Sequence, residues 1–208
     1  MNELLNKVLD NLIVLDTETT GLNPSSDEIL QLSIINGHGE VLFDVLLKPE
    51  HVTSWEAAQA VNGITPEKVK NCLRLRDVYS KIKKILGSYR IILGYNVDFD
   101  LAFLHDYVFG ECQQIVDVMG VFSEIYGEWN EYWGNYKWQK LTKCADYYGY
   151  KWDEESAHNS LGDCKATLFC FKKMLEEGHF QNVLESFSSI LEHPTSVCPG
   201  CKCNCRIL

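Results

Sequence analysis

Four carboxylates and one histidine lie in three short segments whose spacing suits metal-dependent hydrolysis. In the first segment, Asp16 and Glu18 are two residues apart at the end of an apolar run, so in a strand both side chains leave the same face. Carboxylates this close repel each other unless cations lie between them. Taken alone, such a pair is more often a strand end whose acids are solvated by water.

The second segment, residues 94–104, follows a short apolar run and contains Asn96, Asp98 and Asp100. Open α/β sheets bind ligands at the carboxyl ends of their strands, which favours a functional role for these side chains. A structural interpretation is also open. Asn96 can cap the helix that follows, and Asp98 and Asp100 would be favourable near the positive end of that helix.

The third segment places His158 five residues before Asp163, at the start of the last long helical pattern. A capping box with Ser160 as N-cap and Asp163 at the third helical position explains Asp163 but gives His158 no role. Five positions along a continuous helix turn two side chains about 140° apart, so His158 is expected in the preceding loop. From there an imidazole can reach a metal site and act as a base.

The chemistry that suits this set is phosphodiester hydrolysis. Two divalent ions about 4 Å apart can activate a water, neutralise the phosphate and stabilise the leaving oxygen. Carboxylate ligands favour Mg²⁺ or Mn²⁺ over zinc. The formal net charge of −10 argues against a protein that holds long nucleic acid through many Lys and Arg contacts, whereas bound cations would invert the local field.

The elements that must position these residues form one α/β domain. Residues 11–16 contain a continuous apolar run, Leu12 to Leu15, typical of a strand buried on both faces, and residues 30–35 and 41–47 predict an antiparallel hairpin beside it. Residues 90–93 and 114–117 predict two further strands. Helical patterns before and after 90–93 imply that these later strands are parallel. The prediction is a mixed five-stranded sheet, three antiparallel and then two parallel strands, flanked by helices that include 160–177.

In order and spacing, the three segments resemble the motifs of the DEDDh family of 3′-to-5′ exonucleases, which is related to the proofreading subunit of bacterial DNA polymerase III. The resemblance covers roughly residues 11–178 and includes supporting matches at 61–65, at the strand ending in Asp117 and at 140–149. It implies a ribonuclease H-like fold. It also implies an exonuclease domain over residues 1–178 and a C-terminal extension over 179–208.

The resemblance implies specific roles for individual residues. The expected ligands of two divalent cations, Mg²⁺ or Mn²⁺, are Asp16, Glu18, Asp100 and Asp163, and His158 is the expected general base. Asp98 stays outside this set because the motif places the ligand directly after Phe99. The residues expected near the terminal nucleotide are Thr19, Thr20, Leu22, Asn96 and Phe99, although Thr19, Thr20 and Leu22 are equally compatible with turn and core positions. Tyr95 and Asn62 stand where many relatives have histidine, a departure that bears on nucleotide preference.

The implied activity is removal of nucleoside 5′-monophosphates from 3′ ends of single-stranded DNA or short RNA, in proofreading, repair or trimming. The implied partners are nucleic acid ends and a polymerase or repair complex. The alternative is a catalytically silent accessory subunit. Retention of all four acids and the histidine argues against it, because unpaired clustered carboxylates destabilise a fold.

Two further segments stay ambiguous. Residues 126–138 hold six Trp and Tyr residues followed by lysines, which suits either stacking on single-stranded bases or packing on the domain, and Glu128 and Glu131 favour packing. The tail contains Cys198, Cys201, Cys203 and Cys205. It suits a soft-metal site, prenylation at Cys205 or, as the favoured interpretation, an oxidation-prone disordered end.

The sequence also predicts the compartment. No stretch approaches the roughly 18 apolar residues needed to span a bilayer, so no membrane association is expected. Five cysteines are scattered through the predicted domain as small buried residues, a pattern typical of a reducing compartment. A cytoplasmic protein is therefore expected.

Overall fold

The structure is a computed structural model that describes residues 2–104, 113–152, 159–181, 183–185 and 205–206. The predictions for His158 and for Cys198, Cys201 and Cys203 lie outside the described residues. The side chain of Cys205 also lies outside them.

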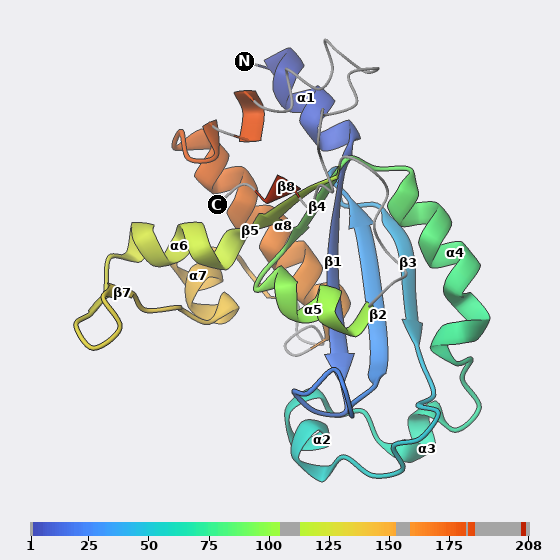
Figure 1. Ribbon diagram of the computed structural model, residues 1–208. Helices are drawn as coiled ribbons and strands as arrows, with labels where there is room; N and C mark the ends of the chain where they lie inside the picture. Colours follow the sequence, from blue (N-terminus) through green and yellow to red (C-terminus); the bar gives the residue numbers. More distant parts are fainter. Residues whose placement is uncertain (1, 105–112, 153–158, 182, 186–204, 207–208) are drawn as a thin grey trace.

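A single mixed sheet forms the centre of the chain, with strand order β3-β2-β1-β4-β5-β8 (Figure 1). Its strands are β1 (Leu12–Thr19), β2 (Ile29–Asn36), β3 (Val41–Leu46), β4 (Ile91–Gly94), β5 (Gln114–Asp117) and β8 (Cys205–Arg206). β2 pairs antiparallel with β1 and β3, whereas β4 is parallel to β1 and β5 to β4. The predicted five-stranded mixed sheet is confirmed. The two-residue β8, from the predicted extension, adds a parallel strand at the β5 edge.

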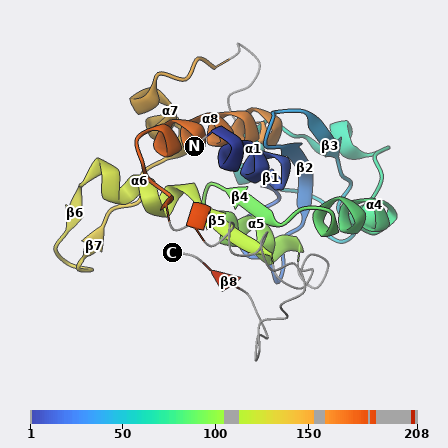
Figure 2. The ribbon, with the colours of Figure 1, turned by 90° about the horizontal axis from the view of Figure 1, so that it is seen from above.

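Helices cover both faces of the sheet. They are α1 (Asn2–Asp10), α2 (Glu56–Asn62), α3 (Pro66–Val69), α4 (Leu75–Gly87), α5 (Val97–Leu104), α6 (Val118–Tyr126), α7 (Leu141–Tyr148) and α8 (Ser160–Glu176). α8 and α7 lie on one side of the sheet and α5 on the other (Figure 2). Among the described helices, none combines the length and the apolar character that crossing a membrane requires. A small hairpin, β6 (Trp129–Asn130) and β7 (Asn135–Tyr136), projects beyond α6 and α7 (Figure 1).

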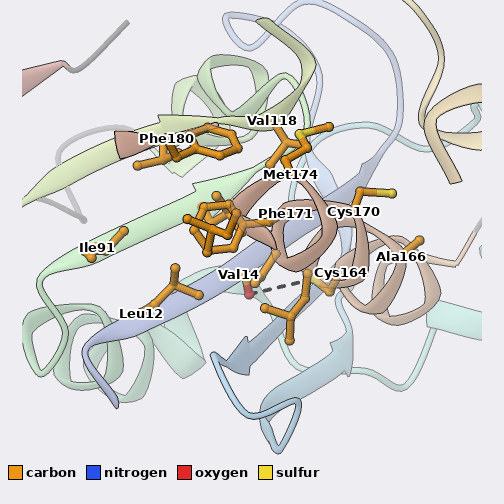
Figure 3. Close-up of a cluster of buried hydrophobic side chains, with 14 of the residues drawn as sticks. Leu12, Val14, Ile91, Val118, Cys164, Ala166, Cys170, Phe171, Met174 and Phe180 are labelled. Atoms are coloured by element: carbon orange, nitrogen blue, oxygen red, sulfur yellow. Dashed lines mark hydrogen bonds between the residues drawn. The ribbon is translucent and has the colours of Figure 1, made fainter. Parts of the chain in front are cut away.

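The core explains why β1 is the central strand. Leu12 and Val14 pack against α8, in the cluster shown in Figure 3, while Ile13 and Leu15 pack against α4 and α5 on the other face. All four side chains are at most 1% exposed. Side chains alternate along a strand, so the continuation of β1 directs residues 16 and 18 to the α8 face and residue 17 to the α5 face.

The structure corrects the prediction for the start of α8. The N-cap is Asn159, whose side chain accepts a hydrogen bond from the Leu161 amide at 3.0 Å. Ser160 is instead the first helical residue, and its hydroxyl lies 2.6 Å from the Ser33 hydroxyl on β2. The capping-box interpretation is therefore wrong, because a tertiary contact engages the serine that a local pattern assigned to the cap.

Candidate active site

Three carboxylates converge where β1 ends and α8 begins. Asp16 and Glu18 come from β1, and Asp163 comes from the first turn of α8. One carboxylate oxygen from each residue lies within 4.8 Å of the other two. We call Asp16, Glu18 and Asp163 the three-carboxylate cluster. All three acids are partly buried, and Asp163 is distant in sequence from Asp16 and Glu18, so the fold brings its charge to the other two.

Burial and mutual repulsion disfavour the ionised forms of these acids. Burial raises the pKa of Asp16 well above its ordinary value, and the charges of Asp100, Asp163 and Glu18 raise it further. Burial raises the pKa of Glu18 to about 8, with Asp163 adding to the effect and a hydrogen bond from Asn62 opposing it. Such a cluster holds protons unless a cation replaces them. An all-carboxylate ligand set fits a hard divalent cation.

Asp100 on α5 approaches the same region from the other face of the sheet. It is 3% exposed, and its Oδ1 accepts hydrogen bonds from the Thr17 amide at 2.9 Å and the Thr17 hydroxyl at 2.7 Å. Burial raises the pKa of Asp100 to about 7, although both Thr17 hydrogen bonds lower it. Asp100 lies outside the three-carboxylate cluster as defined by distance, but its charge acts on Asp16 and Glu18.

The sequence interpretation missed Thr17. Its position between two acids in a strand is the signal that could have identified it, because alternation points it toward the helix that carries Asp100. Thr17 thus orients one acid from α5 while its neighbours present two acids to α8.

The end of β1 and the loop after it hold the first three residues expected to contact a nucleotide. The Thr19 hydroxyl donates to the Gly21 carbonyl at 2.6 Å, and the Thr20 hydroxyl donates to Asp27 at 3.0 Å and accepts from the Glu28 amide at 2.9 Å. Both hydroxyls therefore shape the turn. Leu22, in the first part of the same loop, is 83% exposed, which leaves its apolar side chain open to contact.

Asn96 and Phe99 lie at the carboxyl end of β4, beside Asp100. Asn96 adopts a φ of 62°, in the left-handed region that asparagine tolerates, and its amide donates to Asp117 Oδ1 at 2.8 Å. Asn96 is exposed and Phe99 is partly buried, with its ring 5.0 Å from the ring of Phe103. Asp98 is exposed and stands apart from the three-carboxylate cluster.

Asn62, the last residue of α2, supports the part of the site formed by Glu18 and Thr19. Its Nδ2 donates to the Thr19 carbonyl at 3.3 Å, and its Oδ1 accepts from the Ile64 amide at 3.0 Å. Gly63, which follows it, has a φ of 66° that favours glycine. Asn62 therefore links the α2 region to both Glu18 and the loop after β1.

Comparisons with known proteins identify the family to which the chain belongs. Residues 13–171 match the family described as exonuclease. An uncharacterized exonuclease of Escherichia phage 186 is 31% identical over 76% of this chain and 85% of its own length. A DNA polymerase III subunit epsilon-like protein of Rhodobacter capsulatus is 31% identical over 80% of this chain, which spans only 24% of that protein.

A solved structure shows the same fold. The zinc-bound E. coli exonuclease I complex with single-stranded DNA superposes with a TM-score of 0.65 and 20% identity, over 88% of this chain and 43% of that chain. The predicted ribonuclease H-like arrangement is confirmed. On the match over residues 13–171 and the phage relative, the chain belongs to the exonuclease family.

Proposed function

We propose that this protein is a metal-dependent 3′-to-5′ exonuclease that releases nucleoside 5′-monophosphates from single-stranded DNA or short RNA. The observation that carries the proposal is the three-carboxylate cluster, with ligand atoms within 4.8 Å, in a chain of the exonuclease family. Asp16, Glu18, Asp100 and Asp163 are the proposed ligands of two divalent cations, Mg²⁺ or Mn²⁺. When bound, such ions supply an activated water and neutralise charge on the phosphate.

The chain's own residues have separate tasks in this proposal. Thr17 holds the Asp100 carboxylate in one orientation through two hydrogen bonds to the same oxygen. His158 accepts the proton of the attacking water, which a neutral imidazole can do near neutral pH. Leu22 and Phe99 offer apolar contacts to the sugar and base of the terminal nucleotide, while Thr19 and Thr20 keep the loop in shape.

The proposed substrate and the proposed partner complex are suggested by the relatives. Exonuclease I was solved with single-stranded DNA, which supports single strands as the substrate. The epsilon-like relative supports association with a polymerase or repair complex. Residues 1–178 are the proposed catalytic domain, with 179–208 as an extension. The free thiols of Cys72, Cys144, Cys164 and Cys170 support a cytoplasmic location.

The direct test is hydrolysis of 5′-labelled single-stranded DNA and RNA with Mg²⁺ or Mn²⁺, with and without chelator. A ladder that shortens one nucleotide at a time is expected, and a blocked 3′ end should stop it. Asp16→Asn should abolish the ladder. Asp98→Asn is the matched control, because Asp98 is an exposed acid beside Asp100 that lies outside the proposed ligand set.

Two outcomes would overturn the proposal. Release of labelled mononucleotide from the 5′ end would reverse the direction. Absence of hydrolysis with either metal, together with tight binding to a polymerase, would favour the silent accessory subunit instead.

A further inference from the structure

The hairpin formed by β6 and β7 carries an exposed aromatic surface. Trp129, Tyr132, Trp133 and Trp138 are 50%, 83%, 72% and 71% exposed, so the expectation that these rings pack on the domain is wrong. Tyr126, by contrast, packs near the rings of Phe122 and Tyr147, at 5.7 and 6.5 Å. We call residues 129–138 the aromatic hairpin.

The aromatic hairpin lines an open cavity of about 410 Å³. Its lining residues are Asn130, Trp133, Asn135, Tyr136, Lys137 and Trp138. Ring faces, amide groups and an ammonium group therefore share one concave surface. The protein offers this surface even though its formal net charge is −10.

Hydrogen bonds fix the shape of the aromatic hairpin. Asn130 Oδ1 accepts from the amides of Tyr132 and Trp133 at 3.1 and 3.3 Å, which holds the turn. Lys137 pairs with Glu128 at 2.9 Å across the base of the hairpin. The rings of Trp129 and Tyr136 meet edge to face at 5.1 Å. The exposed rings are thus presented by a defined scaffold.

A further contact ties the aromatic hairpin to the sheet edge that carries the candidate active site. The Tyr95 hydroxyl donates to the Gln139 carbonyl at 2.7 Å, and Tyr95 directly precedes Asn96 at the end of β4. In Figures 1 and 2 the hairpin projects outward beyond α6, away from β1. Only a strand longer than the terminal nucleotide would reach both places.

We propose that the aromatic hairpin binds unstacked bases of a single-stranded nucleic acid whose 3′ end lies in the candidate active site. Exposed Trp and Tyr faces stack on bases of any sequence, and nearby lysines complement the phosphates. The segment supplies Lys137 at the cavity, where it also pairs with Glu128, and Lys140 and Lys143 within five residues of the end of the hairpin. The cavity combines the rings of Trp133 and Trp138 with Asn130, Asn135 and Lys137, groups that can stack on bases and form hydrogen bonds with them, and in a chain of the exonuclease family these features favour a single strand over a protein partner. The inference rests on the proposed exonuclease function and extends its substrate contacts.

The test compares a Trp133→Ala, Trp138→Ala double variant with the parent. Binding is measured by fluorescence anisotropy in chelator, with labelled single-stranded DNA or RNA of about 20 nucleotides, a length that exceeds the usual site of one binding fold. Loss of one stacked base is expected to weaken binding about fivefold to a hundredfold. Binding of both DNA and RNA should weaken, because stacking on the bases does not distinguish deoxyribose from ribose. Leu73→Ala is the matched control, since Leu73 is 58% exposed and lies outside the hairpin.

Hydrolysis rates on a long and a short substrate distinguish this inference from the proposed exonuclease function. The double variant should show a raised KM on the long strand and parental turnover of the 4-nitrophenyl ester of thymidine 5′-monophosphate, which is too short to reach the hairpin. Trp133→Phe, Trp138→Phe retains ring faces and should bind close to the parent, which excludes general damage to the fold.

If the alanine variant binds and cleaves long strands as the parent does, the inference is overturned and the exonuclease proposal stands. If the parent cleaves neither substrate, the exonuclease proposal fails, while anisotropy still decides whether the hairpin binds single strands.

Discussion

The hydroxyl oxygens of Ser33 and Ser160 lie 2.6 Å apart and join β2 to the first residue of α8. Ser33 is the cross-strand neighbour of Asp16, and Ser160 lies one turn before Asp163. The Ser33 hydroxyl also bonds Asp44 Oδ1 at 2.9 Å, and an ionised carboxylate only accepts, so Ser33 donates to Asp44. Ser160 therefore donates to Ser33. This chain of hydrogen bonds fixes the distance between the two elements that carry the three-carboxylate cluster.

Replacement of either serine should weaken both stability and activity. Both side chains are fully buried, and Ser33→Ala removes the acceptor of the Ser160 hydroxyl and a donor to Asp44, which should cost about 1–3 kcal/mol of the free energy of unfolding. Ser160→Ala should cost less, because Ser33 keeps its hydrogen bond to Asp44. The double variant removes both groups and should lose less than the sum of the single variants. Urea unfolding of the four proteins measures this coupling, and strictly additive losses would contradict the proposed contact.

Thr17→Val should weaken the proposed metal site without disturbing the core. Valine matches the shape of threonine but cannot donate to Asp100, while the backbone hydrogen bond at 2.9 Å remains. A hydrogen bond to a charged group contributes about 1.5–3 kcal/mol, so about tenfold or more Mn²⁺ should be needed for half-maximal activity. Metal titration of the hydrolysis rate measures the effect. Thr17→Ser keeps the hydroxyl and should behave like the parent, and an equal loss in both variants would argue against the role of this hydrogen bond.

The stability of the metal-free protein should fall as pH rises. The folded-state pKa values of Glu18 and Asp100 are raised to about 8 and about 7, whereas unfolded acids titrate near about 4. The folded form thus holds protons that the unfolded chain has released. Its stability contribution from these groups is complete below about pH 4 and is lost as pH rises through about 7 to 8.

Mn²⁺ should reverse this trend, because the cation replaces the protons of the cluster. The gain in Tm on adding Mn²⁺ should grow between about pH 5 and pH 8. Glu18→Gln removes one titrating group, so its metal-free Tm should depend less steeply on pH. Thermal unfolding with chelator and with Mn²⁺ tests this, and identical slopes for the parent and Glu18→Gln would sink the prediction.

His158→Ala should slow hydrolysis about a hundredfold to ten-thousandfold, the usual contribution of a general base. An imidazole accepts a proton only when neutral, so the parent rate should fall on acidification below about pH 6.5. Rates measured across pH at saturating Mn²⁺ give the comparison. The assignment fails if the variant keeps the parent's full rate and pH profile.

The sequence alone predicted the mixed five-stranded sheet, because alternation and strand ends are local patterns, whereas the common site of Asp16, Glu18 and Asp163 was implied by the resemblance to known exonucleases. The long-range contacts of Ser160 and Thr17 escaped prediction, since each depends on a partner from another element, Ser33 or Asp100. The exposure of Trp133 escaped as well. Aromatic side chains suit both packing and solvent-facing surfaces, so their type does not decide between the two.

β1 and α8 pack together but lie far apart in the sequence, at residues 12–19 and 160–176, and this order has a consequence for biosynthesis. A ribosome exposes Asp16 and Glu18 early, but Asp163 emerges only with the helix that also buries Leu12 and Val14. A nascent or prematurely terminated chain therefore has neither a covered central strand nor a third acid. The unfinished protein would not hydrolyse nucleic acid near the translating ribosome, because the proposed nuclease site and the last large helix of the core are completed together.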